Sequence, residues 1–142
     1  MNPKTINFYT DGAHSSVTKH GGWAVYCPEL MLKIANQESD TTNNRMEMTA
    51  AIKALEFVFR TRIPVEGVNI YSDSLYVINT MKGLYAKKTN LDLWHQLSSL
   101  VSKLTERGLM VNWIHVKGHA GHMHNEVVDR LANLLSQTKL KT

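Results

Sequence analysis

The spacing of apolar residues changes near Asn44, and that change restricts the fold more than any other feature. In the first part, apolar and polar residues alternate at residues 5–10, which is the period of a half-buried β-strand, and two further short strand runs follow at residues 23–27 and 31–35. From Asn44 the spacing becomes that of an amphipathic helix, with an apolar face over residues 51–58. The change predicts an antiparallel meander followed by a helix that covers it.

The second half of the chain alternates between the two periods. Strands are predicted at residues 65–72 and 111–116, and helices at residues 75–82, 91–106 and 125–136. The predicted order is therefore βββαβααβα, which is typical of a three-layer α/β fold with a five-stranded mixed sheet and helices on both faces. A length of 142 residues suits one domain spanning residues 1–142, with residues 137–142 expected to be a flexible tail.

Composition favours a cytoplasmic protein with an anionic partner. The single Cys27 lies in a predicted strand and has no internal partner for a disulfide, as expected in a reducing compartment. No signal sequence opens the chain, and no window approaches the length of a membrane span. The net charge of +4 favours binding to an anion such as nucleic acid, although the charge alone does not establish it.

Four acidic side chains occupy positions that could bring them together. Asp11 and Asp73 each follow a predicted strand and precede a small residue. Carboxylates at the carboxyl ends of neighbouring strands can converge in one crevice. Glu47 and Asp129 lie on or beside the apolar faces of predicted helices. We therefore expect four carboxylates at one edge of the sheet.

Each acid also has an ordinary structural interpretation. Asp11 and Asp73 stand in Asp-Gly and Asp-Ser pairs, which are common in turns. Glu47 stands three residues after Asn44, the spacing of a helix capping box. Asp129 lies early in the last predicted helix, where an acid suits the helix dipole. These interpretations treat the acids one at a time and do not account for the set.

A cluster of carboxylates needs neutralisation. Two like charges about 4 Å apart repel by roughly 4 kcal/mol at an effective dielectric constant near 20. The cluster must therefore bind cations or have raised pKa values. An all-oxygen set of ligands without paired cysteines favours Mg²⁺ or Mn²⁺ over Zn²⁺. Such metal clamps serve phosphoryl transfer.

The segments around these acids resemble the type 1 ribonuclease H family, enzymes that cut the RNA of RNA–DNA hybrids. Four motifs carry the resemblance: FYTDG at residues 8–12, TTNNRME at residues 41–47, YSDS at residues 71–74, and WIHVKGHAGH at residues 113–122, which is followed by Asn125, Glu126 and Asp129. They stand in the family's order and on the expected strands and helices. The resemblance covers nearly the whole chain and implies the family's three-layer fold.

The resemblance implies a catalytic centre with two metal ions. Asp11, Glu47, Asp73 and Asp129 match the family's metal-binding carboxylates, which implies two Mg²⁺ ions about 4 Å apart, with Mn²⁺ as the alternative. One ion would activate the attacking water and the other would stabilise the departing 3′ oxygen. The products would carry a 5′-phosphate and a 3′-hydroxyl. His119 matches a loop histidine that assists proton transfer or product departure.

The resemblance also implies the residues that bind the hybrid, which would be the partner of a monomeric enzyme. Thr42, Asn43 and Asn44 match residues that contact the nucleic acid backbone and minor groove. Asn90 matches a contact to the DNA strand, and Trp94 matches a neighbouring aromatic residue. A core position on the helix at residues 91–106 is an equal alternative for Trp94.

The sequence departs from the family on the substrate side. Val17 replaces an Asn that contacts substrate, Asp40 stands where a basic residue is common, and Leu75 stands where a Gln is common. A short segment at residues 83–89 replaces the long basic handle of many bacterial relatives, which makes this a compact form. Lys87 and Lys88, together with Lys82, would form a reduced basic patch for substrate, or they belong to a merely solvated turn.

Three other functions would suit parts of the sequence. A module that binds hybrids without cutting them would suit the altered loops but leaves the four acids unexplained. A zinc hydrolase could be built from His115, His119, His122 and His124, although these positions fall across a strand end and a glycine-rich loop. A transposase or integrase core would share the fold and the acidic chemistry, but it would not be expected to combine the motifs at residues 41–47 and 117–122.

Overall fold

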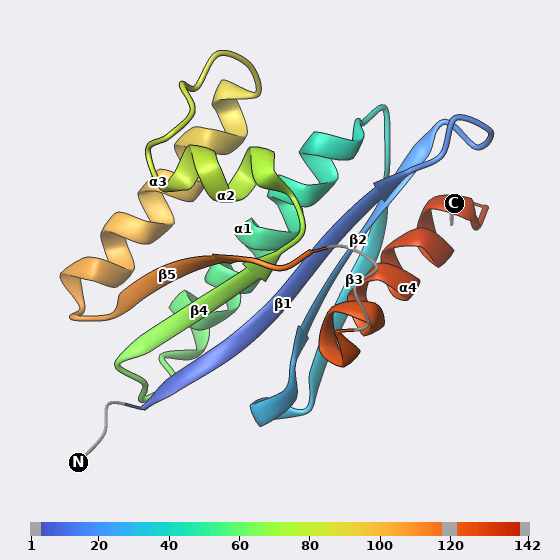
Figure 1. Cartoon of the computed structure of the whole chain (residues 1–142). Helices are drawn as coiled ribbons and strands as arrows, with labels where there is room; N and C mark the ends of the chain where they lie inside the picture. The colour runs from blue at the N-terminus through green and yellow to red at the C-terminus, as the bar shows by residue number, and fades with distance from the viewer. Residues whose placement is uncertain (1–3, 118–121, 140–142) are drawn as a thin grey trace.

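The five strands form one mixed sheet in the order β3-β2-β1-β4-β5. The computed structural model describes residues 4–117 and 122–139. Its elements, in chain order, are β1 (Thr5–His14), β2 (His20–Cys27), the 3₁₀ turn η1 (Pro28–Leu30), β3 (Leu32–Ser39), α1 (Asn43–Thr61), β4 (Gly67–Ser72), α2 (Leu75–Met81), α3 (Leu91–Glu106), β5 (Met110–His115) and α4 (Met123–Gln137) (Figure 1). The predicted order of strands and helices is confirmed, and only η1 was not foreseen.

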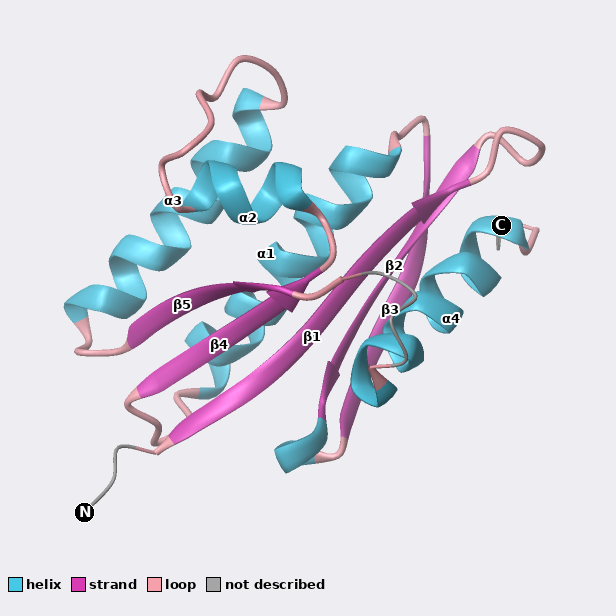
Figure 2. Ribbon diagram, viewed as in Figure 1, coloured by secondary structure: helices cyan, strands magenta, loops and turns pink. Residues whose placement is uncertain are grey.

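Helices cover both faces of the sheet, as predicted. The helices α1, α2 and α3 lie on one face, while α4 lies on the other face over β1, β2 and β3 (Figure 2). The main core fills the space beneath α1 and α3 with side chains such as Phe8, Leu55, Ile70 and Leu97. Cys27 is buried in this core, as its strand position predicted. None of the helices in the described ranges has both the length and the apolarity to cross a bilayer.

The first strand extends four residues beyond its predicted end. The prediction that Asp11 closes a strand is wrong, because the antiparallel ladder between β1 and β2 runs on to the pair His14 and Gly21. Asp11 is itself paired with Ala24 inside this ladder. The turn interpretation of Asp11 and Gly12 is therefore wrong as well.

Helix α4 packs directly on the backbone of β2. A methyl group built on Gly22 would lie 2.5 Å from the carbonyl oxygen of Ala132 and 2.7 Å from Cβ of Leu135. These distances are shorter than van der Waals contact, so only glycine permits this approach. The glycine thereby fixes the height of α4 above the sheet, and with it the height of Asp129.

Side chains from the β1–β2 loop and from β3 satisfy carbonyl groups at the end of α4. Thr18 donates to the carbonyl of Ser136 at 2.6 Å, and Gln37 donates to the carbonyls of Leu135 and Thr138 at 2.8 Å each. The last carbonyls of a helix have no partner within it, so these bonds hold the end of α4 in place. The prediction that residue 137 already belongs to a tail is wrong, because α4 includes Gln137. Residues 140–142 lie outside the described part of the chain.

Candidate active site

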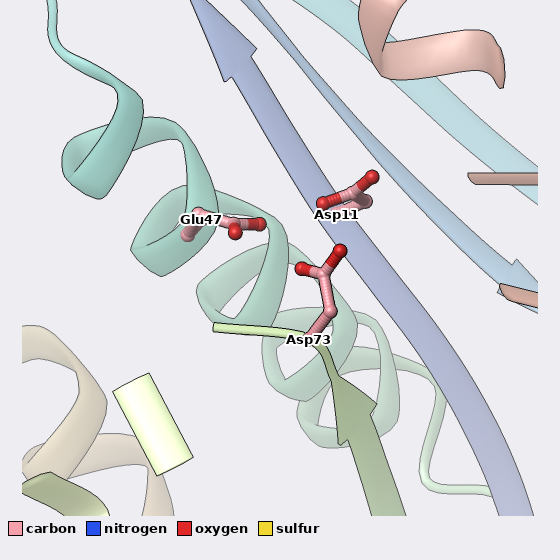
Figure 3. Close-up of side chains that lie close together, drawn as sticks. All are labelled: Asp11, Glu47 and Asp73. Carbon is pink, nitrogen blue, oxygen red and sulfur yellow. The ribbon is translucent and has the colours of Figure 1, made fainter. Parts of the chain in front are cut away.

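Three carboxylates from distant parts of the sequence meet at one point. Asp11 comes from β1, Glu47 from the first turns of α1 and Asp73 from the residue after β4, and their side chains point toward one another (Figure 3). One oxygen atom from each side chain lies within 4.8 Å of the others. Oxygen ligands at this spacing can bind one divalent cation together.

Strand register explains why the two aspartates meet. The parallel ladder between β1 and β4 ends with the pair Tyr9 and Tyr71. Asp11 and Asp73 each stand two residues beyond that pair. Their side chains therefore lie at the same level along the two chains and on the same side of the sheet. Because β4 ends at Ser72 while β1 continues, the gap between them opens where the two carboxylates lie. The two aspartates meet as expected from the sequence. They do so where β1 and β4 separate, and not at the ends of both strands.

Glu47 serves the site and not the helix end. The capping-box interpretation is wrong, because the N-cap of α1 is Thr42, whose hydroxyl accepts a hydrogen bond from the backbone N–H of Arg45. The Glu47 side chain lies inside the protein, and the residue is only 5% exposed. Its Oε1 accepts a hydrogen bond of 2.6 Å from the backbone N–H of Gly12, which also lies 2.9 Å from Oδ1 of Asp11. The backbone of β1 therefore holds both carboxylates.

Burial makes the full ionisation of this cluster costly. Loss of solvent raises the pKa of Asp11 to about 8, and the charges of Asp73 and Asp129 add to the increase, although a hydrogen bond with Glu47 opposes it. Loss of solvent and the charge of Asp11 also raise the pKa of Glu47 well above its usual value. No ion pair within residues 4–117 and 122–139 involves Asp11, Glu47 or Asp73. A hard divalent cation would supply the missing positive charge, and the donor set fits one.

These pKa shifts predict how metal ions affect stability. An acid with a raised pKa holds its proton more tightly in the folded protein, so the free energy of unfolding without metal should fall as pH rises from about 4 toward about 8. A bound cation removes this penalty. We expect Mn²⁺ to increase the free energy of unfolding more at about pH 8 than at about pH 5, as measured by urea denaturation with metal or with EDTA. Equal increases at both pH values would contradict this explanation.

Asp129 lies beside the three carboxylates on the neighbouring helix. It is half-buried on α4, and it acts on Asp11 both through a side-chain hydrogen bond and through its charge. Its own Oδ1 accepts a hydrogen bond from Asn133. The structure thus places the fourth predicted acid next to Asp11, at the side of the three-carboxylate group that α4 covers.

The predicted substrate residues divide into surface and core positions. Thr42, Asn43 and Asn44 are exposed at the start of α1, one to two turns before Glu47. Asn90 is half-buried in a left-handed backbone conformation with φ of 56° at the start of α3. Trp94, in contrast, is only 2% exposed and packs against Tyr76, so its burial supports the core alternative and corrects the expected substrate contact.

Arg45 connects the two segments that were predicted to bind substrate, a connection that sequence reasoning missed. Its guanidinium donates to both carboxylate oxygens of Asp92, at 3.0 and 2.7 Å, and to Oδ1 of Asn90 at 3.1 Å. The hydrogen bond from Arg45 holds the pKa of Asp92 at about 2. Asn90 in turn donates to the hydroxyl of Tyr76. No local pattern could reveal an ion pair between residues 47 positions apart.

The basic loop and the histidines complete the list of predicted residues. Lys82, Lys87 and Lys88 are exposed, and Lys87 donates to the hydroxyl of Ser98. His119 lies outside the described residues. In the part of the chain that the structure describes, His115, His122 and His124 form no metal-binding group.

Comparison with known proteins places the chain among bacterial relatives. Its sequence matches the RNase H family over residues 3–137. It is 39% identical to a ribonuclease H of Thermoanaerobacter sp. (strain X514), with 92% of this chain and 89% of the relative aligned. It is 38% identical to one of Legionella pneumophila (strain Lens), with 91% and 94% aligned.

A solved structure supports the same fold. The N-terminal RNase H domain of a Mycobacterium tuberculosis protein superposes with a TM-score of 0.72 at 21% identity, covering 94% of each chain. The sequence matches show that the chain belongs to the ribonuclease H family.

Proposed function

We propose that this protein is a metal-dependent endonuclease that hydrolyses the RNA strand of RNA–DNA hybrids and leaves 5′-phosphate and 3′-hydroxyl ends. The observation that carries the proposal is the group formed by Asp11, Glu47 and Asp73, in which two of the acids are buried and have raised pKa values. Such a group costs stability unless it binds cations. Membership of the ribonuclease H family supplies the reaction that cations at this position would serve.

The acids divide the binding of metal between them. Asp11, Glu47, Asp73 and Asp129 would hold two Mg²⁺ ions, which in hydrolases of this kind activate water and stabilise the leaving oxygen. Asp11 is the shared member of the set, because Glu47 and Asp73 lie on one side of it and Asp129 acts on it from α4. We assign His119 an assisting part in proton transfer or product departure, as its motif implies.

The rim of the site supports a duplex partner. Thr42, Asn43 and Asn44 present hydroxyl and amide groups to solvent beside the acids, and the ion pair between Arg45 and Asp92 ties this rim to Asn90. Hydroxyl and amide groups suit an A-form-like duplex, whose accessible minor groove displays 2′-hydroxyls and base edges. The 2′-hydroxyl distinguishes RNA from DNA, so this rim would select the strand that is cut.

The proposal is tested by offering the protein three labelled substrates: an RNA–DNA hybrid, duplex RNA and duplex DNA. We expect cleavage of the RNA strand of the hybrid with Mg²⁺ or Mn²⁺ and none with EDTA. End analysis should find 5′-phosphates. An intact hybrid in the presence of both metals would overturn the proposal. If the protein bound the hybrid without cutting it, it would be a hybrid-binding module and not an enzyme.

The lysines of the short loop should contribute to substrate affinity. In the variant with Lys82, Lys87 and Lys88 all changed to Ala, we expect KM to rise several-fold with kcat nearly unchanged, because phosphate contacts bind the ground state and transition state alike. The salt dependence of KM should also become weaker. Lys103→Ala, which removes an exposed lysine near the far end of α3, is the control. A KM equal to that of the parent would show that the three lysines are solvated and do not bind substrate.

A further inference from the structure

Asn133 makes two hydrogen bonds to Asp129, which lies one turn before it on α4. Its Nδ2 lies 2.9 Å from the backbone carbonyl oxygen of Asp129 and 3.1 Å from Oδ1 of the same residue. Both partners accept hydrogen bonds only, so the amide must present its nitrogen to them and its orientation is fixed. One side chain on the same face of the helix therefore holds the carboxylate of Asp129.

The Asp129 carboxylate interacts with Asp11 as well as with Asn133. Asp129 interacts with Asp11 toward the acidic cluster, while Asn133 binds Oδ1 along the helix. The torsion about the bond to its Cβ has a broad and shallow profile, so each hydrogen bond to the carboxylate narrows the orientations it can take. The bond from Asn133 is one such restraint, and it acts together with the interaction with Asp11.

Asn133 contributes little to the packing of α4. The helix buries Val128 and Ala132 against the sheet, whereas Asn133 is exposed. Asparagine also favours the helix less than alanine does, by roughly half a kcal/mol. A residue that is exposed, unfavourable for its helix and bound to a site carboxylate is better explained by the site than by the fold.

We propose that Asn133 is a positioning residue that orients Asp129 to bind a divalent cation. This inference rests on the proposed function, because it assigns Asp129 to the metal site. Partners that hydrogen-bond to metal ligands fix the direction of their lone pairs, and their removal typically weakens metal affinity about 10- to 100-fold. Asn133 acts through Asp129 and has no part in the reaction itself.

The experiment compares Asn133→Ala, Asn133→Gln and Gln137→Ala with the parent protein. A glutamine in place of Asn133 keeps an amide that can reach a carboxylate four residues earlier, so it should restore binding. Gln137→Ala removes an amide one turn farther along α4 and serves as the control. Two measurements are made with Mn²⁺: direct binding to the free protein by electron paramagnetic resonance, and the concentration that gives half-maximal cleavage of the hybrid.

We expect Asn133→Ala to weaken Mn²⁺ binding about tenfold in both measurements, with kcat at saturating metal within about threefold of the parent. Asn133→Gln should recover most of the loss, and Gln137→Ala should show none. Unchanged Mn²⁺ binding in Asn133→Ala, or a loss shared by Gln137→Ala, would overturn the inference. If the parent protein cleaves no hybrid, the proposed function fails, but the binding measurement still decides whether Asn133 supports a metal site.

Discussion

Replacing Asp73 by Asn should slow cleavage of the RNA–DNA hybrid by about a thousandfold or more while the protein stays folded. Asparagine keeps the shape of the side chain but removes the charge of one of the three clustered carboxylates. The metal ions in such sites stabilise the transition state by several kcal/mol, and a loss of roughly 4 kcal/mol corresponds to a thousandfold change in rate. Single-turnover cleavage at saturating enzyme and Mg²⁺ measures the effect on the chemical step.

The thermal midpoint separates loss of chemistry from loss of structure. Asp73 is half-buried and lies between β4 and α2, and its charge adds to the raised pKa values of Asp11 and Glu47. Without metal, Asp73→Asn should therefore melt at the same temperature as the parent or higher. Glu66→Gln, an equivalent change at an exposed position before the other end of β4, should leave the rate and the melting temperature unchanged. An Asp73→Asn protein that is folded and cleaves as fast as the parent would remove Asp73 from the catalytic centre.

The fold could be predicted from the sequence because local patterns follow from burial on one side of each element. The alternation at Ile6 and Phe8 and the helical spacing from Ala51 to Val58 both record contact with the main core. The end of β1 could not be predicted in this way. Residues 11–14 are held in the strand by pairing with β2, which is a contact with another segment, and the sequence at Asp11 and Gly12 favours a turn.

The same limit applies to the site. Asp11 and Asp73 could be proposed because each follows a predicted strand, and Glu47 because it lies on the apolar face of a predicted helix. The structure brings the three together as expected. Arg45 and Asn133 have no such distinguishing position, since an arginine and an asparagine near the surface of a helix are ordinary. Their importance comes from the partners they meet, on another helix for Arg45 and one turn away for Asn133, and only the three-dimensional structure shows these contacts.

Gly12 connects the fold to the site more tightly than any other residue outside the acids. A methyl group on its Cα would lie 2.3 Å from both the backbone nitrogen of Glu47 and the carbonyl carbon of Met46. Both atoms belong to the backbone of α1, so no side chain can turn aside to make room. Glycine is thus required for α1 to approach β1 closely enough for the Gly12 N–H to reach Glu47.

Gly12→Ala should therefore be strongly destabilising. Overpacking of this kind costs about 3 kcal/mol or more, which lowers the thermal midpoint by about 10 °C in a domain of this size. Gly67→Ala is the matched control, because its new methyl group would meet the side chain of Thr5 at 3.2 Å and the backbone of Met110 only at 3.4 Å. It should change stability by less than about 1 kcal/mol.

Cleavage by Gly12→Ala, measured at a temperature where the variant remains folded, should also fall, because α1 must move away and carry Glu47 with it. The loss should appear first as a need for more Mn²⁺, since the separation of Glu47 from Asp11 weakens the shared binding of the cation. A Gly12→Ala protein as stable as Gly67→Ala would show that α1 can move away from β1 with little loss of stability. A destabilised protein with an unchanged Mn²⁺ requirement would show that Glu47 does not depend on this contact for its position.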